Sequence, residues 1–382
     1  MAARTIPAET LLGIFDHLSK KDLFLARQVC SRWRVVGTPA LYRQLSFHAR
    51  EGNSYYPVVE DVPKNAHHVK GLSLNIYDSN TSPSQYISET IQTLQLFSNV
   101  RTFVYNDKDY ANSLKWCILW KVLGQAITSM PHLASLHIYH YIPSGTWQNP
   151  NPLDDSPDSP VLRQRPPNLQ DITVELRIDR FEPSHCIAAF FERLFAAVEG
   201  AEYLVSQVWL FWYSTNGGNP RGPSPRNWDP NAWKLQNLQA LGLFDSPHLL
   251  LTTIVSADFS KLKTLHIHAR NFAPLITYFS RETTAAAGFR NLEMISIDAT
   301  GAVIYLTFTH LKNSLIEQYL PDVLKYFPSI KELEIMTPCE IFTIPISRGN
   351  DGVLVAGEPY DSSAFVQDEP GDDDMEKFPH PG

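Results

Sequence analysis

The sequence predicts an α/β protein in which a small N-terminal helical unit precedes a β/α solenoid, or horseshoe, of about nine irregular repeats. Apolar residues recur at helical spacing through the first 48 residues. A six-residue string of apolar and variable positions then returns about every 33 residues, and helical stripes lie between several of its copies. The chain has 382 residues, which is enough for two or three domains.

The helical unit is predicted to begin at Pro7, because proline suits the first turn of a helix. A wide apolar stripe at helical period follows, consisting of Leu11, Leu12, Ile14, Phe15 and Leu18. We expect Ser19 to cap a second helix, with Asp22 three residues later as a weaker form of the capping-box carboxylate.

A third helix is expected from Cys30 onward and is predicted to break at Gly37 and Pro39. Three to four helices in about forty residues can form only a thin core. The unit therefore has more apolar residues than it can easily bury, which is typical of a docking module.

This pattern resembles the F-box: Ile6-Pro7 stands at the family's Leu-Pro position, and Leu41-Tyr42 has Tyr where Trp is common. The resemblance implies docking on a Skp-type adaptor and, through it, on a cullin–RING ubiquitin ligase. The implied adaptor-binding residues are Ile6, Pro7, Leu11, Leu12, Ile14, Phe15, Leu18, Leu23, Val29, Cys30, Trp33, Leu41 and Tyr42. Which of these face the partner and which face the core stays open, and a generic helical cap on a solenoid is the alternative.

Nine copies of the repeated string follow: VKGLSL (69–74), VRTFVY (100–105), LASLHI (133–138), LQDITV (169–174), VSQVWL (205–210), LQALGL (238–243), LKTLHI (262–267), LEMISI (292–297) and IKELEI (330–335). Their alternation predicts strands with one buried face. Between the strings the apolar period becomes helical, most clearly in the stripe Ile187, Phe190, Phe191, Leu194 and Phe195.

Strand followed by helix, in series, resembles the leucine-rich-repeat horseshoe, and together with the head the chain resembles a fungal-type F-box protein with degenerate repeats. The family's Asn or Cys, three residues past the last apolar position of each string, is missing here. The turns must therefore be satisfied in another way, and irregular curvature is expected. An ordinary α/β domain with an open parallel sheet is the alternative.

Residues between the apolar positions are expected to face an open inner wall, where outward Trp209 and Phe211 would mark a binding site. The candidate substrate-binding residues are Trp209, Phe211, His137, Tyr139, Phe244, His266 and His268. Two insertions, 142–168 and 214–233, follow the third and fifth strands and either contact the substrate or cover the aromatic residues. Ser156 and Ser159, each before a proline, are candidate phosphorylation sites.

The predicted boundaries are an F-box at 1–48, a linker at 49–68, the solenoid at 69–345, a C-terminal cap at 346–366 that includes a possible strand at Val353–Ala356, and an acidic disordered tail at 367–382. The net charge is −8, and residues 351–382 hold nine acidic side chains against one lysine. Residues 1–50 instead hold eight Lys or Arg against three acids. A basic head beside an acidic remainder favours an acidic protein partner.

Features of other functional classes are missing from the sequence. It contains no GxSxG, P-loop, GxGxxG, HExxH or EF-hand string, so we expect no enzyme activity, catalytic residue, cofactor or metal. The four cysteines lie far apart and read as reduced core thiols, and neither a signal peptide nor a membrane span is present. An intracellular protein, cytoplasmic or nuclear, with no nucleic-acid or membrane partner is expected.

The sequence thus favours a non-catalytic substrate-recognition subunit of an SCF-type ubiquitin ligase, in which the F-box docks on the adaptor and the repeats bind an unknown protein substrate. An adaptor-bound interaction scaffold without ligase activity is the alternative. An enzyme with an unrecognised site is a third possibility that no sequence feature supports.

Overall fold

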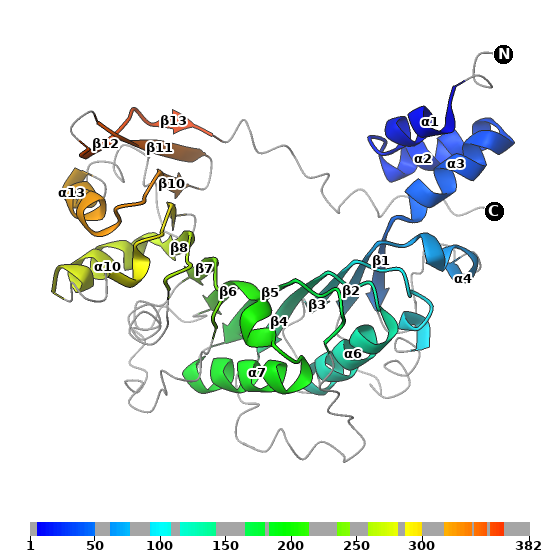
Figure 1. Ribbon diagram of the computed structural model, residues 1–382, viewed down its shortest axis with the longest axis horizontal. Helices are drawn as coiled ribbons and strands as arrows, with labels where there is room; N and C mark the ends of the chain where they lie inside the picture. Colours follow the sequence, from blue (N-terminus) through cyan, green and yellow to red (C-terminus); the bar gives the residue numbers. More distant parts are fainter. Residues whose placement is uncertain are drawn as a thin grey trace. The chain divides into compact units, whose positions relative to one another are not determined.

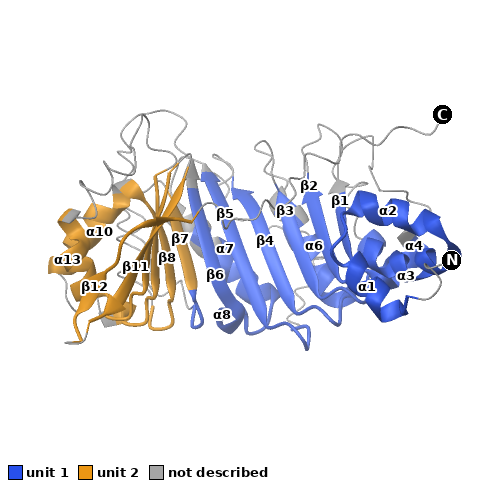
Figure 2. Ribbon diagram, turned by 90° about the horizontal axis from the view of Figure 1, so that it is seen from above, with its two compact units in different colours: residues 1–239, 255–258 blue, residues 240–254, 259–382 orange. Residues whose placement is uncertain are grey.

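The structure, a computed structural model, describes residues 6–49, 62–76, 92–107, 115–142, 165–179, 183–213, 235–244, 259–281, 287–299, 317–337, 340–349 and 352–362. The chain divides into two compact units, coloured separately in Figure 2. Unit 1 comprises Met1–Gln239 with Val255–Asp258, and unit 2 comprises Ala240–Ile254 with Phe259–Gly382. Each is a mixed α/β unit whose strands neighbour one another in chain order.

Unit 1 begins with a helical head of three helices, α1 (Ala8–Phe15), α2 (Lys20–Val29) and α3 (Ser31–Tyr42) (Figure 1). The predicted cap of α2 is confirmed, because the backbone N–H of Asp22 donates to Ser19 Oγ at 3.2 Å. The predicted break in the third helix is wrong, since α3 continues through Gly37 and Pro39. Packing of α3 against both α1 and α2 outweighs the low helix propensity of these two residues.

The described residues of unit 1 form the sheet strands β1 (Gln44–Ala49), β2 (Gly71–Ile76), β3 (Thr102–Asp107), β4 (Ser135–Ile142), β5 (Asp171–Asp179) and β6 (Val205–Tyr213). Neighbouring strands are parallel throughout. Strand β1, which was not predicted, starts two residues after α3 ends. The sheet therefore begins inside the range expected for the helical unit.

All nine predicted strands are present, and in most of them the strand starts two residues into the string. The first apolar residue of the string, for example Val69 or Leu133, is buried at the turn before the strand. The later apolar residues pair in register with their counterparts, as Leu72 does with Phe103 and Phe103 with Leu136. The buried face of each strand is therefore the face that the alternation predicted.

Neighbouring repeats of unit 1 are joined at the start of their strands by a recurring backbone pattern. The N–H groups of Lys70 and Gly71 both donate to the carbonyl of Arg43. Arg101 and Thr102 make the same pair of bonds to the carbonyl of Lys70. The pattern fixes the register of each new strand on the preceding repeat.

An asparagine before the string supplies a polar link that the expected ladder position lacks. Asn99 Nδ2 donates to the carbonyl of His67 at 2.8 Å, and Asn168 Nδ2 donates to that of Pro131 at 2.9 Å. Asn291 makes the corresponding bond in unit 2. Each asparagine directly precedes the first apolar residue of its string, so the turns are satisfied from the strand entry rather than from the strand exit.

The helices of unit 1 beyond the head are α4 (Val62–Asn65), the 3-10 turn η2 (Ala66–His68), α6 (Lys115–Ser129), α7 (Pro183–Ala197) and α8 (Ala201–Leu204). Helices α6 and α7 lie against one face of the sheet (Figure 1). The stripe predicted for α7 is buried at Ile187, Phe190, Phe191 and Leu194. The opposite face of the sheet keeps partly exposed side chains along β3, β4, β5 and β6.

Unit 2 contains β7 (Ala240–Phe244), β8 (Thr264–His268), α10 (Ala269–Arg281), η5 (Ala287–Phe289), β9 (Met294–Asp298), α13 (Glu317–Tyr326) and β10 (Glu332–Met336). Its strands β7 to β10 are parallel. Phe279 of α10 packs edge-on against Phe289 and Phe327, with ring centroids 5.1 and 5.5 Å apart. This aromatic cluster lies between the helices and the turns of unit 2.

The last strands of unit 2 are antiparallel: β11 (Ile341–Arg348) pairs with β10, and β12 (Leu354–Ala356) and β13 (Tyr360–Asp361) pair with β11. The predicted strand at Val353–Ala356 is confirmed as β12, whereas β11 and β13 were not predicted. Residues 143–164 of the first insertion, which include Ser156 and Ser159, lie outside the described residues, as do the insertion 214–233 and the acidic tail. No helix in the described ranges is both long and apolar enough to cross a membrane.

Candidate functional site

Helix α3 is the centre of the helical head and contacts both of the other helices. The buried core beside it consists of Leu11 and Phe15 from α1 and Leu23 and Ala26 from α2. Trp33 of α3 packs edge-on against Phe15, with ring centroids 5.5 Å apart. The core is small, as the length of the helices predicts, and it uses only part of the apolar residues of the head.

Five large apolar side chains of the head remain exposed, and we call them the apolar surface of the head: Ile14, Phe24, Leu25, Val29 and Val35. Their exposed fractions run from 45% for Ile14 to 72% for Val35. Leu25 and Val29 lie one helical turn apart on α2 and are therefore neighbours. Half of the ten exposed large apolar residues found in the described part of the chain belong to these three helices. Such a concentration indicates a surface that binds another molecule.

The structure separates the predicted adaptor-binding residues into three groups. Leu11, Phe15, Leu23 and Tyr42 are buried in the head and are at most 9% exposed, so they face its core. Partly buried positions are Ile6, Leu12, Leu18, Cys30, Trp33 and Leu41. Exposed positions are Pro7, Ile14 and Val29. A residue of the first group can affect docking only by holding the helices in place.

Three exposed residues, Phe24, Leu25 and Val35, were missed by sequence reasoning. Their signal is a run of adjacent apolar residues, Leu23-Phe24-Leu25 and Val35-Val36. Consecutive residues of a helix point about 100° apart, so a helix with one buried stripe cannot bury all members of such a run. The surplus members must face outward, as they do here.

Ion pairs and caps hold the head together at its ends. Arg43, just after α3, forms a salt bridge with Asp16, just after α1, with 2.8 Å between Nη1 and Oδ1. Ser19 Oγ donates to the carboxylate of Asp22 at 2.7 Å while accepting the backbone N–H of the same residue. The salt bridge links the ends of α1 and α3, whereas the cap stabilises the first turn of α2.

A second candidate surface is the open face of the unit 1 sheet. His137 and Tyr139 of β4, and Trp209 and Phe211 of β6, are all half-buried there, as the alternation predicts. Strand β5 lies between β4 and β6 and pairs its Glu175 with both Tyr139 and Trp209. The four predicted residues of unit 1 therefore share one face and span three adjacent strands.

Charged side chains complete this face. Arg177 Nε donates to Glu175 Oε1 at 2.8 Å, and the Arg177 guanidinium lies over the ring of Phe211, 5.7 Å from its centroid. The cation is thus held between a carboxylate and an aromatic ring, which fixes its position. The face combines aromatic rings with an ordered ion pair, a composition that suits protein recognition.

A serine, a histidine and an aspartate meet at the start of the same strands, but their order differs from that of a catalytic triad. Ser135 Oγ lies 3.0 Å from His137 Nε2 and 3.4 Å from Asp171 Oδ2. Ser206 Oγ donates to the other oxygen of Asp171. Burial lowers the pKa of His137, and the charge of Asp171 opposes that shift. Because the serine bridges the histidine and the aspartate, the imidazole is not oriented as a general base by the carboxylate.

A buried pair that the sequence did not single out lies on the opposite, helix-covered face. Asp107 Oδ2 is 3.4 Å from His140 Nδ1, and both side chains are at most 2% exposed. The His140 ring stacks on Phe190 of α7 with centroids 6.4 Å apart. A substrate cannot reach these groups, so we read them as polar residues of the core.

The predicted substrate-binding residues of unit 2 are less accessible than expected. Phe244 is 8% exposed and His268 is 3% exposed, so both are buried and do not face an open wall as expected. His266 is half-buried, and burial lowers its pKa from 6.5 to about 4. Its neighbour in register, Ser296, donates to Glu334 Oε1 at 2.7 Å. In the described ranges no three His, Cys, Asp or Glu side chains are placed to hold a metal ion.

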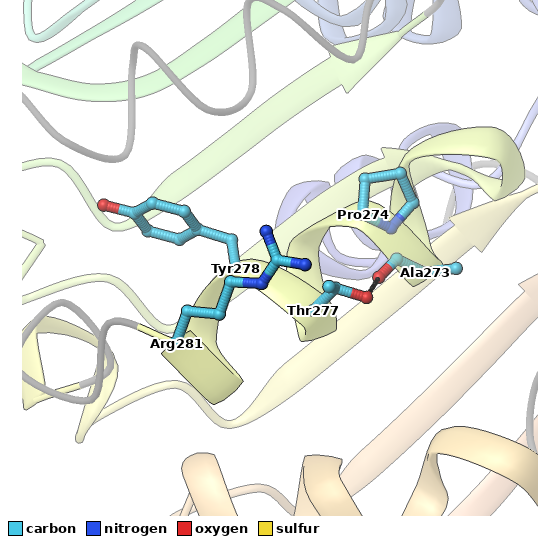
Figure 3. Close-up of a pocket in the computed structure, with 5 residues that line it drawn as sticks. All are labelled: Ala273, Pro274, Thr277, Tyr278 and Arg281. Atoms are coloured by element: carbon cyan, nitrogen blue, oxygen red, sulfur yellow. Dashed lines mark hydrogen bonds between the residues drawn. The ribbon is translucent and has the colours of Figure 1, made fainter.

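A hollow of about 460 Å³ lies beside α10 of unit 2 and is lined by Ala273, Pro274, Thr277, Tyr278 and Arg281 (Figure 3). Thr277 Oγ1 is engaged with the carbonyl of Ala273 at 2.8 Å. Among these lining residues there is no acid, thiol or imidazole that could act as a base or nucleophile.

One family model matches part of the chain. Residues 3–48 match the family model described as F-box-like, a span that contains α1, α2 and α3 and most of β1. A solved structure of a protein from Bacteroides fragilis is similar at 13% identity with a TM-score of 0.39. The similarity covers 72% of this chain and 66% of that one, so the chain spans just under two thirds of the solved protein. No curated protein matches the sequence.

Proposed function

Because residues 3–48 form an F-box-like domain, we propose that this protein is the substrate-recognition subunit of an SCF-type cullin–RING ubiquitin ligase. The head docks on a Skp-type adaptor, and the α/β region binds the protein substrate. The protein performs no chemistry itself, in keeping with the adaptor role of F-box domains. The observation that carries the proposal is the apolar surface left exposed on a domain matched as F-box-like.

The energetics of the apolar surface support docking. Burial of a Leu, Ile, Val or Phe side chain contributes roughly 1.5–3 kcal/mol when the side chain was fully exposed. The five residues are 45–72% exposed, so each would contribute about half of that on being covered. The five together would contribute roughly 4–7 kcal/mol, which is comparable to the lower end of the cost of association, about 4–15 kcal/mol. The apolar surface of the head can therefore supply part of the docking energy, and other contacts must supply the rest.

The docking test uses exposed positions, because substitution of a core residue such as Leu11 would unfold the head instead of testing its surface. In the full chain, Leu25→Asp with Val29→Asp places two charges on the apolar surface of the head, where the side chains are 54% and 58% exposed. We expect copurification with a Skp-type adaptor and a cullin to fall at least about ten-fold. The circular dichroism spectrum should stay unchanged.

The matched control introduces the same charges on exposed apolar residues of unit 1 outside the head, through Leu96→Asp with Tyr203→Asp. This variant should retain the adaptor. Undiminished adaptor capture by the Leu25/Val29 variant would refute the docking assignment. Capture of the adaptor without the cullin, together with stable levels of all interactors after gene deletion, would instead support the scaffold alternative.

We place the substrate on the open face of the unit 1 sheet, where Trp209, Phe211, Tyr139 and His137 lie beside the Glu175–Arg177 pair. Aromatic and arginine side chains dominate the binding energy of most protein interfaces, and here they cluster on three adjacent strands. We also propose that the repeats form a horseshoe and that this face is its inner wall.

A further inference from the structure

Three cationic residues occupy equivalent positions at the amino-terminal edge of the unit 1 sheet. The backbone pattern that joins the repeats links Lys70 to Arg43 and Arg101 to Lys70, so these residues lie side by side on consecutive strands. Adjacent strands are about 4.8 Å apart, and the row therefore extends over roughly 10 Å. We call Arg43, Lys70 and Arg101 the basic row.

The charges of the basic row are largely uncompensated. Arg43 and Arg101 are exposed and Lys70 is half-buried. Arg43 pairs with Asp16, but neither Lys70 nor Arg101 has an acidic partner in the described ranges. The pKa of His68 is lowered, mainly by burial and then by the positive charges of His67 and Lys70. The charge of Lys70 is therefore felt by a neighbouring side chain.

In unit 2 the residues at the equivalent positions, just before each strand, neutralise one another's charge. There the backbone pattern joins Lys263, Glu293 and Lys331 in the same way. Lys331 Nζ lies 2.7 Å from Glu293 Oε2, and the hydrogen bond from Lys331 lowers the pKa of that carboxyl. An acid thus alternates with lysines in unit 2, whereas unit 1 has three cations in succession.

From this contrast we propose that the basic row is an electrostatic extension of the head's docking surface, and that it receives an acidic segment of the Skp-type adaptor. The inference rests on the proposed function. Continuity supports the choice of partner, since the Asp16–Arg43 salt bridge connects the end of α1, close to Ile14, directly to the row. In addition α3 contacts α4 and η2, which lead into Lys70. A partner that covers the head therefore lies next to the row.

An acidic protein segment fits the row better than a nucleic acid does. Three cations can neutralise only a few charges, whereas specific nucleic-acid binding engages many phosphates. The chain as a whole carries a net charge of −8, which repels a long polyanion, while a short acidic segment responds mainly to the nearby row.

The test measures association of the full-length protein with a purified Skp-type adaptor by stopped flow at about 50 mM and about 500 mM salt. Lys70→Glu with Arg101→Glu should slow association about five-fold at low salt, because charges at the rim of an interface act mainly on the association rate. The difference should shrink at high salt, and the dissociation rate should change little. The matched control, Lys263→Glu with Lys331→Glu, makes the same charge change at the equivalent positions of unit 2 and should leave the rate near that of the wild type.

Each outcome has a distinct meaning. If the wild type does not bind the adaptor at all, the proposed function fails and takes the inference with it. If the adaptor binds but both double variants associate equally fast, the inference alone is overturned. Slowing of the Lys70/Arg101 variant that persists at high salt would also overturn it, because that result would indicate a structural defect rather than a lost charge.

Discussion

Gly37 is the residue on which the packing of the head depends most directly. A Cβ at this position would lie 3.1 Å from Arg27 Cγ and 3.2 Å from Phe15 Cε2. The arginine side chain can move, but Phe15 is 1% exposed and packs against Trp33. The absence of a side chain therefore lets α3 approach α1 and α2 closely, and this explains why a glycine stands inside the helix.

We predict that Gly37→Ala destabilises the protein by about 1 kcal/mol, because overpacking of 1–3 kcal/mol exceeds the gain in helix propensity of about 1 kcal/mol. Gly13→Ala on α1 is the control, since a Cβ there meets no atom within 4 Å. That substitution should stabilise by roughly 0.5–1 kcal/mol. Thermal denaturation of both variants checks the sign, and stabilisation by both would mean that Phe15 can move aside.

His266 makes the stability of the protein depend on pH. Burial lowers its pKa from 6.5 to about 4, so the unfolded chain takes up a proton at a higher pH than the folded chain does. Between these two values the unfolded state binds more protons, and stability falls as the pH falls. Above pH 6.5 the effect vanishes because the imidazole is neutral in both states.

We therefore expect His266→Gln to remove a pH-dependent loss on the order of 2–3 kcal/mol between pH 6.5 and pH 4. Urea denaturation at several pH values measures the slope in wild type and variant. The slope, not the stability at one pH, is decisive, because glutamine also changes the contacts beside Ser296. Equal slopes in the two proteins would show that His266 does not titrate abnormally.

At the scale of the elements, the asparagines before the strings determine how one repeat is attached to the next. Each donates to a carbonyl of the preceding repeat, and the donor stands at the strand entry instead of three residues past the string. The sequence alone showed only that the expected ladder residue was missing. In the structure Asn99 and Asn168 take the role of the missing residue, because the turns place them beside those carbonyls.

Replacing Asn99 and Asn168 by alanine should cost about 1 kcal/mol for each lost hydrogen bond. The loss should appear locally, as faster amide hydrogen exchange at the first residues of β3 and β5. Ser329→Ala is the control, because Ser329 directly precedes a string as well but makes no such side-chain bond. Uniform exchange throughout unit 1 would contradict a local role for the asparagines.

For the whole molecule, the proposal assigns two functions to two surfaces of unit 1. In this proposal the apolar surface of the head would bind the adaptor, and the open sheet face would bind the substrate. Because these surfaces use different residues, substitutions in one should leave the other intact. The two activities should thus be separable by mutation.

We predict that Trp209→Ala with Phe211→Ala reduces proximity labelling of substrate proteins in cells at least about five-fold while the adaptor and cullin are labelled as before. The Leu25/Val29 variant should show the opposite pattern. Loss of adaptor labelling in the Trp209/Phe211 variant would indicate a folding defect or a shared surface. An unchanged set of labelled proteins would exclude this face as the substrate site.

The strands were the most predictable part of the fold. Alternation in strings such as LASLHI leaves one choice of buried face, because a shift by one residue would expose Leu136 and Ile138 together. Strand β1 and the antiparallel strands β11 and β13 lie outside the repeated pattern. β1 pairs with β2, β11 with β10 and β13 with β11, and none of the three has the repeated string that predicted the other strands.

The docking residues show the limit of sequence reasoning most clearly. The F-box-like pattern and the surplus of apolar residues in the head were evident from the sequence by itself. The sequence did not show which of these apolar residues are buried and which are exposed. In the structure Leu11 and Phe15 fill the core, while Leu25 and Val35 face outward. Helical period alone cannot show which members of a run of adjacent apolar residues are buried, because the buried side of each helix depends on where α3 packs. Only the tertiary contacts, made close by Gly37, determine that direction.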